Sequence, residues 1–168
     1  TPQDVVLNLA SGVYGKGFGY WAKRYSSNLL EIETAYNEAI DPQAVQNMLT
    51  KHPEITVVSV CHHDTPSGTI NPIDDIGALV ASHGAYLIVD AVSSFGGMKT
   101  HPEECHADIY ITGPNKCLGA PPGLTMAGIS DRAWTKMKAN PSAPRASMLS
   151  ILDWEKAWSR NEPFPFTP

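Results

Sequence analysis

The sequence predicts an α/β fold, a mainly parallel sheet covered by helices, and two observations support this prediction. Short apolar runs alternate along the chain with segments that carry helix-capping residues, which is typical of strands joined by crossover helices. The run Tyr86-Leu87-Ile88-Val89 has no polar break, as expected for a strand buried on both faces of a parallel sheet. Open α/β sheets bind ligands at the carboxyl ends of their strands, so functional groups are expected there.

Capping residues and glycines predict where the helices begin and end. Asp41 and Pro42 supply an N-cap and a first-turn proline for a helix over residues 42–50. Pro72 begins another helix, which ends near Gly84. Glycines in residues 11–15 predict a turn there, followed by a helix over residues 19–26. The expected strands are residues 5–9, 28–32, 55–60, 86–89, 109–111 and 124–129, and the last helices are residues 131–139 and 152–158.

Length and composition limit the classes of protein to which the chain can belong. Its 168 residues predict a single domain, residues 1–168, and 42% hydrophobic with 17% charged residues describe a soluble globular chain. A net charge of −5 argues against a nucleic-acid binder, which needs clustered Lys and Arg. No apolar stretch approaches the roughly 20 residues of a membrane span. Three cysteines without a CxxC pattern predict no disulfide framework and a cytoplasmic location.

Two residues with complementary chemistry follow neighbouring expected strands. Asp90 ends the run of residues 86–89, and Lys116 follows residues 109–111 within Thr112-Gly113-Pro114-Asn115. A lysine with a lowered pKa attacks carbonyl groups as an amine, and a carboxylate holds a protonated ring nitrogen. Pyridoxal phosphate (PLP) requires these two groups. The alternative interpretation is a strand-end cap for Asp90 and a solvated loop lysine for Lys116.

The stretches VDAVSSFGG and TGPNKCLGAPPG resemble the class V aminotransferases of fold type I, which include alanine–glyoxylate and serine–glyoxylate aminotransferases. The resemblance extends over essentially the whole chain. Along HHDTPSGTINPIDDIGALV and NPSAPRASMLSILDW it is strongest to members that act on pyridoxamine and pyruvate. It implies that residues 1–168 are the central part of the large domain of a PLP-dependent transferase. The segments that flank this part in the family, one of which supplies the arginine for the substrate carboxylate, are absent from the sequence.

The resemblance also implies roles for individual residues. Lys116 matches the lysine that forms the Schiff base, and Asp90 matches the partner of the pyridine nitrogen. Tyr14, in GVYG, matches an aromatic residue that stacks on the ring, with a core tyrosine as the alternative. Thr65, in DTPSG, matches a contact to the phenolic oxygen region, with a Ser/Thr turn as the alternative. Relatives often carry ESSTG at this place, so Pro66 is a departure.

Two further positions match phosphate contacts of the family. Asn115, next to the lysine, often reaches the cofactor phosphate, although a Gly-Pro-Asn turn needs no ligand to explain an asparagine. Thr167 matches a residue that reaches the phosphate of the other subunit. No metal is expected, because Cys61-His62-His63-Asp64 lacks the spacing that lets two ligands meet one ion.

The function implied by the resemblance is transfer of an amino group from pyridoxamine to pyruvate, which gives pyridoxal and alanine through a lysine Schiff base. This reaction belongs to the degradation of vitamin B6. Pyridoxamine and pyridoxal are then substrate and product, whereas PLP is the bound cofactor in the wider family. One alternative is a PLP-dependent alanine–glyoxylate or serine–glyoxylate aminotransferase. Another is a catalytically silent domain for oligomer contacts, and the resemblance implies a homodimer or homotetramer.

Overall fold

The computed structural model describes residues 1–160, which divide into two compact units. Residues 2–130 form the larger unit, and the smaller unit begins at Asp131. The expectation that residues 1–168 form one domain stays a prediction, and each unit is described by itself.

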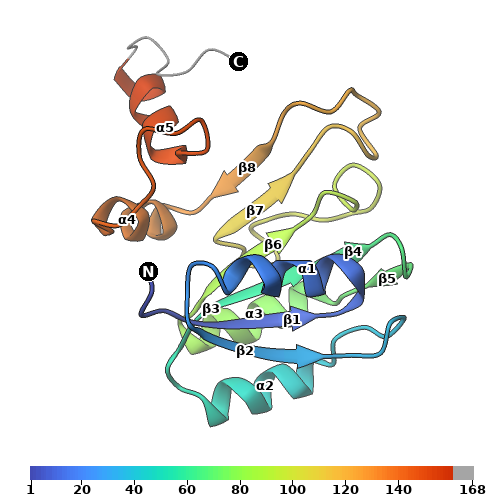
Figure 1. Ribbon diagram of the computed structural model, residues 1–168. Helices are drawn as coiled ribbons and strands as arrows, with labels where there is room; N and C mark the ends of the chain where they lie inside the picture. Colours follow the sequence, from blue (N-terminus) through green and yellow to red (C-terminus); the bar gives the residue numbers. More distant parts are fainter. Residues whose placement is uncertain (161–168) are drawn as a thin grey trace. The chain divides into compact units, whose positions relative to one another are not determined.

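The larger unit is built on a six-stranded sheet with the order β2-β1-β3-β6-β7-β8 (Figure 1). The strands are β1 (Val5–Ala10), β2 (Asn28–Glu33), β3 (Ile55–Cys61), β6 (Tyr86–Asp90), β7 (Ile109–Thr112) and β8 (Met126–Ile129). The first five strands in this spatial order run parallel, and β8 pairs antiparallel with β7. The mainly parallel α/β fold that the sequence predicts is confirmed.

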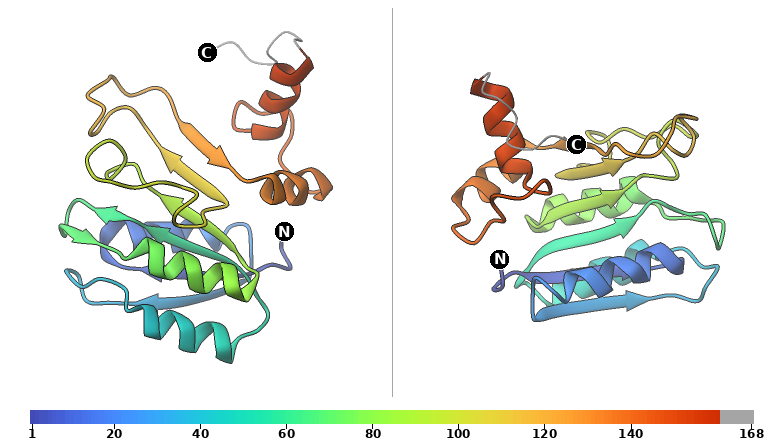
Figure 2. Two further views of the ribbon diagram at one scale, coloured as in Figure 1. Left: turned by 180° about the vertical axis from the view of Figure 1, so that it is seen from behind. Right: turned by 45° about the horizontal axis from the view of Figure 1, so that its top comes forward.

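Helices cover both faces of this sheet. The helices are α1 (Gly12–Ala22), α2 (Pro42–Lys51) and α3 (Ile73–His83). In Figure 1, α1 lies in front of the sheet, and in the reverse view of Figure 2, α2 and α3 lie in front. The crossovers thus place α1 on one face and the other two helices on the opposite face.

The hydrophobic core lies between the sheet and α2 and α3. Its fully buried side chains come from the central strands and from the inward stripe of each helix, including Leu7, Leu9, Val45, Val58, Val60, Ile76, Val80, Leu87 and Val89. In β6, Leu87 and Val89 are fully buried, whereas Tyr86 and Ile88 are half-buried. The expectation that this strand is buried on both faces therefore holds fully for the face of Leu87 and Val89, while the opposite face is only half-buried. On the face opposite to α2 and α3, helix α1 packs on β1, β2 and β3 rather than on β6.

Helices α2 and α3 begin and end where the capping residues predict. The carboxylate of Asp41 accepts a hydrogen bond from the backbone N–H of Gln43 at 2.9 Å, and Pro42 is the first residue of α2. Helix α3 ends at His83, and Gly84 follows with a φ of 86°. A glycine adopts this left-handed conformation without steric cost.

The first helix differs from its prediction, because α1 begins at Gly12 rather than near residue 19. Of the two glycines that predict a turn, Gly12 begins the helix with a φ of 67°, whereas Gly15, like the later Gly19, lies where α1 approaches the sheet. A Cβ on Gly15 would lie 3.0 Å from the carbonyl oxygen of Leu9, and one on Gly19 would lie 2.2 Å from Glu31 Oε1. Close packing, and not backbone freedom, therefore explains both of these glycines.

A short hairpin follows β3, where the sequence predicts only a break. Strand β4 (His63–Asp64) pairs antiparallel with β5 (Thr69–Ile70). Its turn holds Thr65, Pro66, Ser67 and Gly68, and Gly68 has a φ of 70°. Two-residue strands are too short to give a recognisable apolar pattern, which explains why the sequence does not predict them.

The smaller unit holds two helices, α4 (Asp131–Ala139) and α5 (Ile151–Arg160). Lys138 Nζ lies 2.9 Å from Glu155 Oε1 and so joins the two helices. Asp153 accepts a hydrogen bond from the backbone N–H of Ala146 at 2.8 Å. Both helices confirm their predicted positions. Within residues 1–160, no helix combines the length and the apolar character that a bilayer span requires.

Candidate active site

The candidate site lies where neighbouring parallel strands end. The register pairs Cys61 of β3 with Asp90 of β6, and Asp90 with Ile111 of β7. Because all three strands run in the same direction, the segments that follow them leave the sheet at one edge. Tyr14, Thr65, Asp90 and Lys116 all follow such strand ends, on β1, β3 with its hairpin, β6 and β7.

Asp90 is half-buried at the end of β6. Its Oδ1 accepts a hydrogen bond from the backbone N–H of Val92 at 2.9 Å. Among the residues that the structure describes, its Oδ2 has no hydrogen-bond partner. Burial raises the pKa of Asp90 most strongly, the charge of Asp64 raises it further, and the charge of Lys116 lowers it. The carboxylate would therefore be stabilised by a cationic ligand group.

Lys116 lies in the exposed turn that follows β7. Its Nζ makes no hydrogen bond or ion pair within the described part of the chain. Its charge lowers the pKa of Asp90, and the strand that precedes its turn pairs directly with the strand that Asp90 ends. An amine and an acid at the ends of adjacent strands can contact opposite ends of one small heterocycle, as PLP chemistry requires.

The backbone carbonyl of Ser93 holds the surrounding segments together. It accepts a hydrogen bond from His63 Nδ1 at 3.2 Å and from Cys117 Sγ at 3.6 Å. In addition, the backbone N–H of His62 donates to the carbonyl of Asp90 at 2.9 Å. The hairpin, the segment after Asp90 and the lysine turn are therefore linked by direct hydrogen bonds.

The structure shows the positions of three of the remaining predicted residues, but not of the fourth. The side chain of Tyr14 is exposed at 45% near the start of α1, so its ring is available to a ligand. Thr65 and Asn115 are exposed in the hairpin turn and in the lysine turn. Thr167 lies outside the described residues. The roles of these residues toward a cofactor stay predictions.

Asp64 is a site residue that the sequence analysis considered only as a metal ligand. It is completely buried, and its Oδ1 accepts a hydrogen bond from the backbone N–H of Tyr14 at 2.7 Å. Its contact with α1 joins residues 50 positions apart. The sequence contains no local pattern that could predict such a long-range contact.

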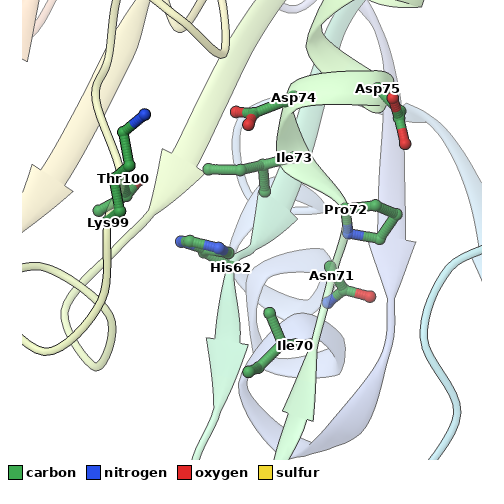
Figure 3. A pocket seen from close by; sticks show the side chains of 9 residues that line it. All are labelled: His62, Ile70, Asn71, Pro72, Ile73, Asp74, Asp75, Lys99 and Thr100. Carbon is green, nitrogen blue, oxygen red and sulfur yellow. The ribbon is translucent and has the colours of Figure 1, made fainter.

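A separate cavity of about 320 Å³ lies at the start of α3. Figure 3 shows it between the first turn of this helix and the segment that carries Lys99 and Thr100. His62 lines it, and burial lowers the pKa of this histidine. Its Nδ1 is buried and has no partner among the described residues. None of the predicted ring-binding residues lines this cavity.

The Cys61-His62-His63-Asp64 stretch is divided among different surroundings. His63 contacts the Ser93 carbonyl, His62 lines the cavity beside α3, and Asp64 binds the start of α1. Within residues 1–160, no three His, Cys, Asp or Glu side chains are placed to hold a metal ion. Burial, with the charges of Asp90 and Asp64, raises the pKa of the Cys61 thiol to about 12.

Comparison with known proteins gives one family and several relatives. The family model described as "Aminotransferase class-V" matches residues 20–166. Pyridoxamine–pyruvate transaminase of Mesorhizobium japonicum is 85% identical over 168 residues, which is all of this chain and 43% of that protein. Alanine–glyoxylate aminotransferase of Drosophila melanogaster is 31% identical over 92% of this chain and 39% of its own length. The chain thus spans less than half the length of these relatives.

Solved structures likewise match nearly all of this chain and less than half of their own length. The crystal structure of pyridoxamine–pyruvate aminotransferase from Mesorhizobium loti superposes with a TM-score of 0.96 and 85% identity, covering 100% of this chain and 43% of that one. Alanine–glyoxylate aminotransferase from Nostoc sp. superposes with a TM-score of 0.88 and 25% identity over 98% of this chain and 45% of that one.

Proposed function

Because the chain belongs to the class V aminotransferase family, we propose that the protein which carries it transfers an amino group from pyridoxamine to pyruvate. The products are pyridoxal and alanine. The choice of substrates is supported by the 85% identity to a protein named pyridoxamine–pyruvate transaminase. Class V aminotransferases are in general PLP-dependent, so the chemistry of the site must suit a pyridine ring of this type.

One observation carries the proposal. Asp90 ends one of two adjacent parallel strands, Lys116 lies in the turn that follows the other, and the charge of Lys116 lowers the pKa of Asp90. The groups around them suit the ring. A carboxylate oxygen without another partner suits a protonated ring nitrogen, an amine suits the carbonyl carbon, and the exposed ring of Tyr14 offers a stacking surface.

In the proposed reaction each residue has a separate task. Asp90 would keep the proton on the ring nitrogen, because an ion pair between them offsets the burial of the carboxylate. Tyr14 would hold the ring plane by stacking, which contributes roughly 0.5–1.5 kcal/mol beyond burial. The bound ring supplies an electron sink for the carbon that loses its proton.

Lys116 would have two tasks. Its Nζ would form a Schiff base with pyridoxal, and as a free amine it would move the proton between the substrate carbon and C4′. Asn115 and Thr65 would contact the rim of the same ligand. We also propose that Thr167 reaches the site of a second subunit, in a homodimer or homotetramer. A cytoplasmic location agrees with the free thiols of Cys61, Cys105 and Cys117.

The test uses the full-length protein and absorbance. Pyridoxal should produce the visible band of a lysine Schiff base, and Lys116→Ala should remove it. Lys99→Ala is the matched control, because this exposed lysine lies in the segment after β6, and the band should persist. In the same preparation, pyridoxamine should drive the consumption of pyruvate without any added phosphate ester.

Three outcomes would contradict parts of this proposal. A band that survives Lys116→Ala would show that another amine carries the chemistry. Activity with alanine and glyoxylate that needs PLP, without activity toward pyridoxamine, would support an alanine–glyoxylate or serine–glyoxylate aminotransferase. If neither pyridoxal nor PLP gives a band, the result would favour the alternative of a catalytically silent domain for oligomer contacts.

A further inference from the structure

We infer that Asp64 is a positioning residue of the amino-transfer site, because its buried carboxylate ties the start of α1, and with it Tyr14, to the hairpin turn that carries Thr65. This inference rests on the proposed function for the identity of the ligand. The contacts themselves lie entirely within the larger unit of the chain.

The carboxylate of Asp64 uses both of its oxygens. Oδ1 accepts the backbone N–H of Tyr14 at 2.7 Å, and Oδ2 accepts the backbone N–H of Ser67 at 3.1 Å and its hydroxyl at 2.6 Å. The nearby backbone N–H of Val13 also lowers the pKa of this carboxyl. One side chain therefore holds two segments that are far apart in the sequence.

Helix α1 depends on Asp64 for the capping of its first turn. Its own N-cap residue, Ser11, makes no capping hydrogen bond, because the hydroxyl donates to the carbonyl of Glu38 at 2.9 Å. The first turn contains no acidic residue either. A carboxylate at this place satisfies unpaired N–H groups and interacts favourably with the helix dipole. Asp64 supplies from a distant hairpin what helices usually obtain from their own N-cap.

Gly12 provides the space that this arrangement needs. Its φ of 67° is left-handed, and a Cβ at this position would lie 2.3 Å from both Cγ and Oδ2 of Asp64. A larger residue at position 12 would displace the carboxylate as well as strain the backbone.

The ionisation of Asp64 agrees with this role. Burial by itself raises the pKa of this carboxyl, but the hydrogen bonds from Ser67 and Tyr14, with the nearby backbone N–H of Val13, together outweigh burial, so the pKa lies below its usual value. The carboxylate is therefore charged at neutral pH. The hydrogen bond that Asp64 accepts from the backbone N–H of Tyr14 fixes this residue, the third of α1. Thr65, which follows Asp64 in the chain, begins the hairpin turn.

The test compares Asp64→Ala with Asp41→Ala in the full-length protein. Asp41 caps α2 through the backbone N–H of Gln43, so its loss removes the same kind of interaction away from the site. In the ligand-free protein, Asp64→Ala should speed amide exchange at Tyr14 and Ser67 by roughly five- to tenfold. With pyridoxal bound to Asp64→Ala, the ellipticity of the visible band per unit of its absorbance should fall, because the ring is attached to the protein but poorly oriented. Asp41→Ala should change neither quantity.

Asp64→Asn gives a second measurement if the alanine variant folds poorly. The amide oxygen can still accept the N–H of Tyr14, whereas the amide nitrogen cannot accept the N–H of Ser67. Exchange should therefore stay near the parent rate at Tyr14 and increase at Ser67. A general loss of stability would instead move both amides together and would leave the ellipticity per unit of absorbance unchanged.

The results separate this inference from the proposed function. If the parent protein gives a pyridoxal band, and both Asp64 variants keep the parent exchange rates and the parent ellipticity per unit of absorbance, Asp64 does not position the site. If the parent protein gives no band with pyridoxal or PLP, the proposed function fails, and with it the ligand of this inference. Accelerated exchange at Tyr14 would then still support the capping of α1 by Asp64.

Discussion

The contact between Asn8 and Ser59 should couple the stability of β1 to that of β3. Asn8 is completely buried, and its Oδ1 accepts the hydroxyl of Ser59 at 2.8 Å. Its Nδ2 donates to the carbonyl of Gly15 at 3.0 Å and to Glu31 Oε1 at 3.1 Å. The side chain therefore joins β1 to β3, to β2 and to the helix that carries Tyr14.

The expected losses follow from these bonds. Ser59→Ala leaves a buried amide oxygen unpaired, which costs about 1–3 kcal/mol of unfolding free energy. Asn8→Ala leaves the hydroxyl of Ser59 unpaired and also creates a cavity, so its loss should be about 2–4 kcal/mol. In the double variant both partners of the hydrogen bond between Asn8 and Ser59 are gone, while Gly15 and Glu31 lose their donor as they do in Asn8→Ala alone. The double variant should therefore be about 1–2 kcal/mol more stable than the sum of the single losses predicts.

The assay is amide exchange of β1 and β3 in the ligand-free full-length protein, which gives the free energy of opening for these strands. Ser82→Ala is the control, because the hydroxyl of Ser82 bonds to the carbonyl of Ala78 on an exposed helix face, and its loss should stay within about 0.5 kcal/mol. Single losses that add within about 0.5 kcal/mol in the double variant would refute the coupling.

Three further predictions concern charge, packing and thiol reactivity. Without ligand, Asp90→Asn should stabilise the protein at pH 7, because burial raises the pKa of this carboxyl above its usual 3.8. The gain should fade as the pH falls through the raised pKa of the folded protein toward 3.8, where both the folded and the unfolded state are protonated, which unfolding midpoints against pH would measure; a gain that grows toward acid would contradict it. Gly77→Ala should cost about 1–3 kcal/mol, since its Cβ would lie 1.9 Å from a backbone carbonyl oxygen. Gly17→Ala, with no atom within 4 Å of the new Cβ, should gain up to about 1 kcal/mol in the same thermal unfolding assay, and equal effects would contradict the packing account. Iodoacetamide should label the exposed Cys117 in the native protein and leave the buried Cys61 unmodified, which mass spectrometry would measure. Labelling of Cys61 before Cys117 would contradict the burial of these two thiols.

Local sequence signals determined the order and type of most elements. Apolar runs located the central strands β1, β3, β6 and β7, because a strand buried in a parallel sheet needs continuous apolar side chains. Capping residues such as Asp41 and Gly84 located α2 and α3, since their effect on a helix end involves only residues close by in the chain. Asp90 and Lys116 were singled out for the same reason, as chemically distinctive residues at strand ends.

Tertiary structure alone decided how the candidate site is supported. Gly15 predicted a turn, but it lies within α1, where a Cβ would lie 3.0 Å from the backbone oxygen of Leu9 in β1. Asp64 was unremarkable in the sequence, and only folding brings it to the start of α1, 50 residues away. Burial and neighbouring charges set the pKa of Asp90 in the same way. Such effects depend on distances in space between segments, and a pattern along the chain carries no information about those distances until the strands are ordered.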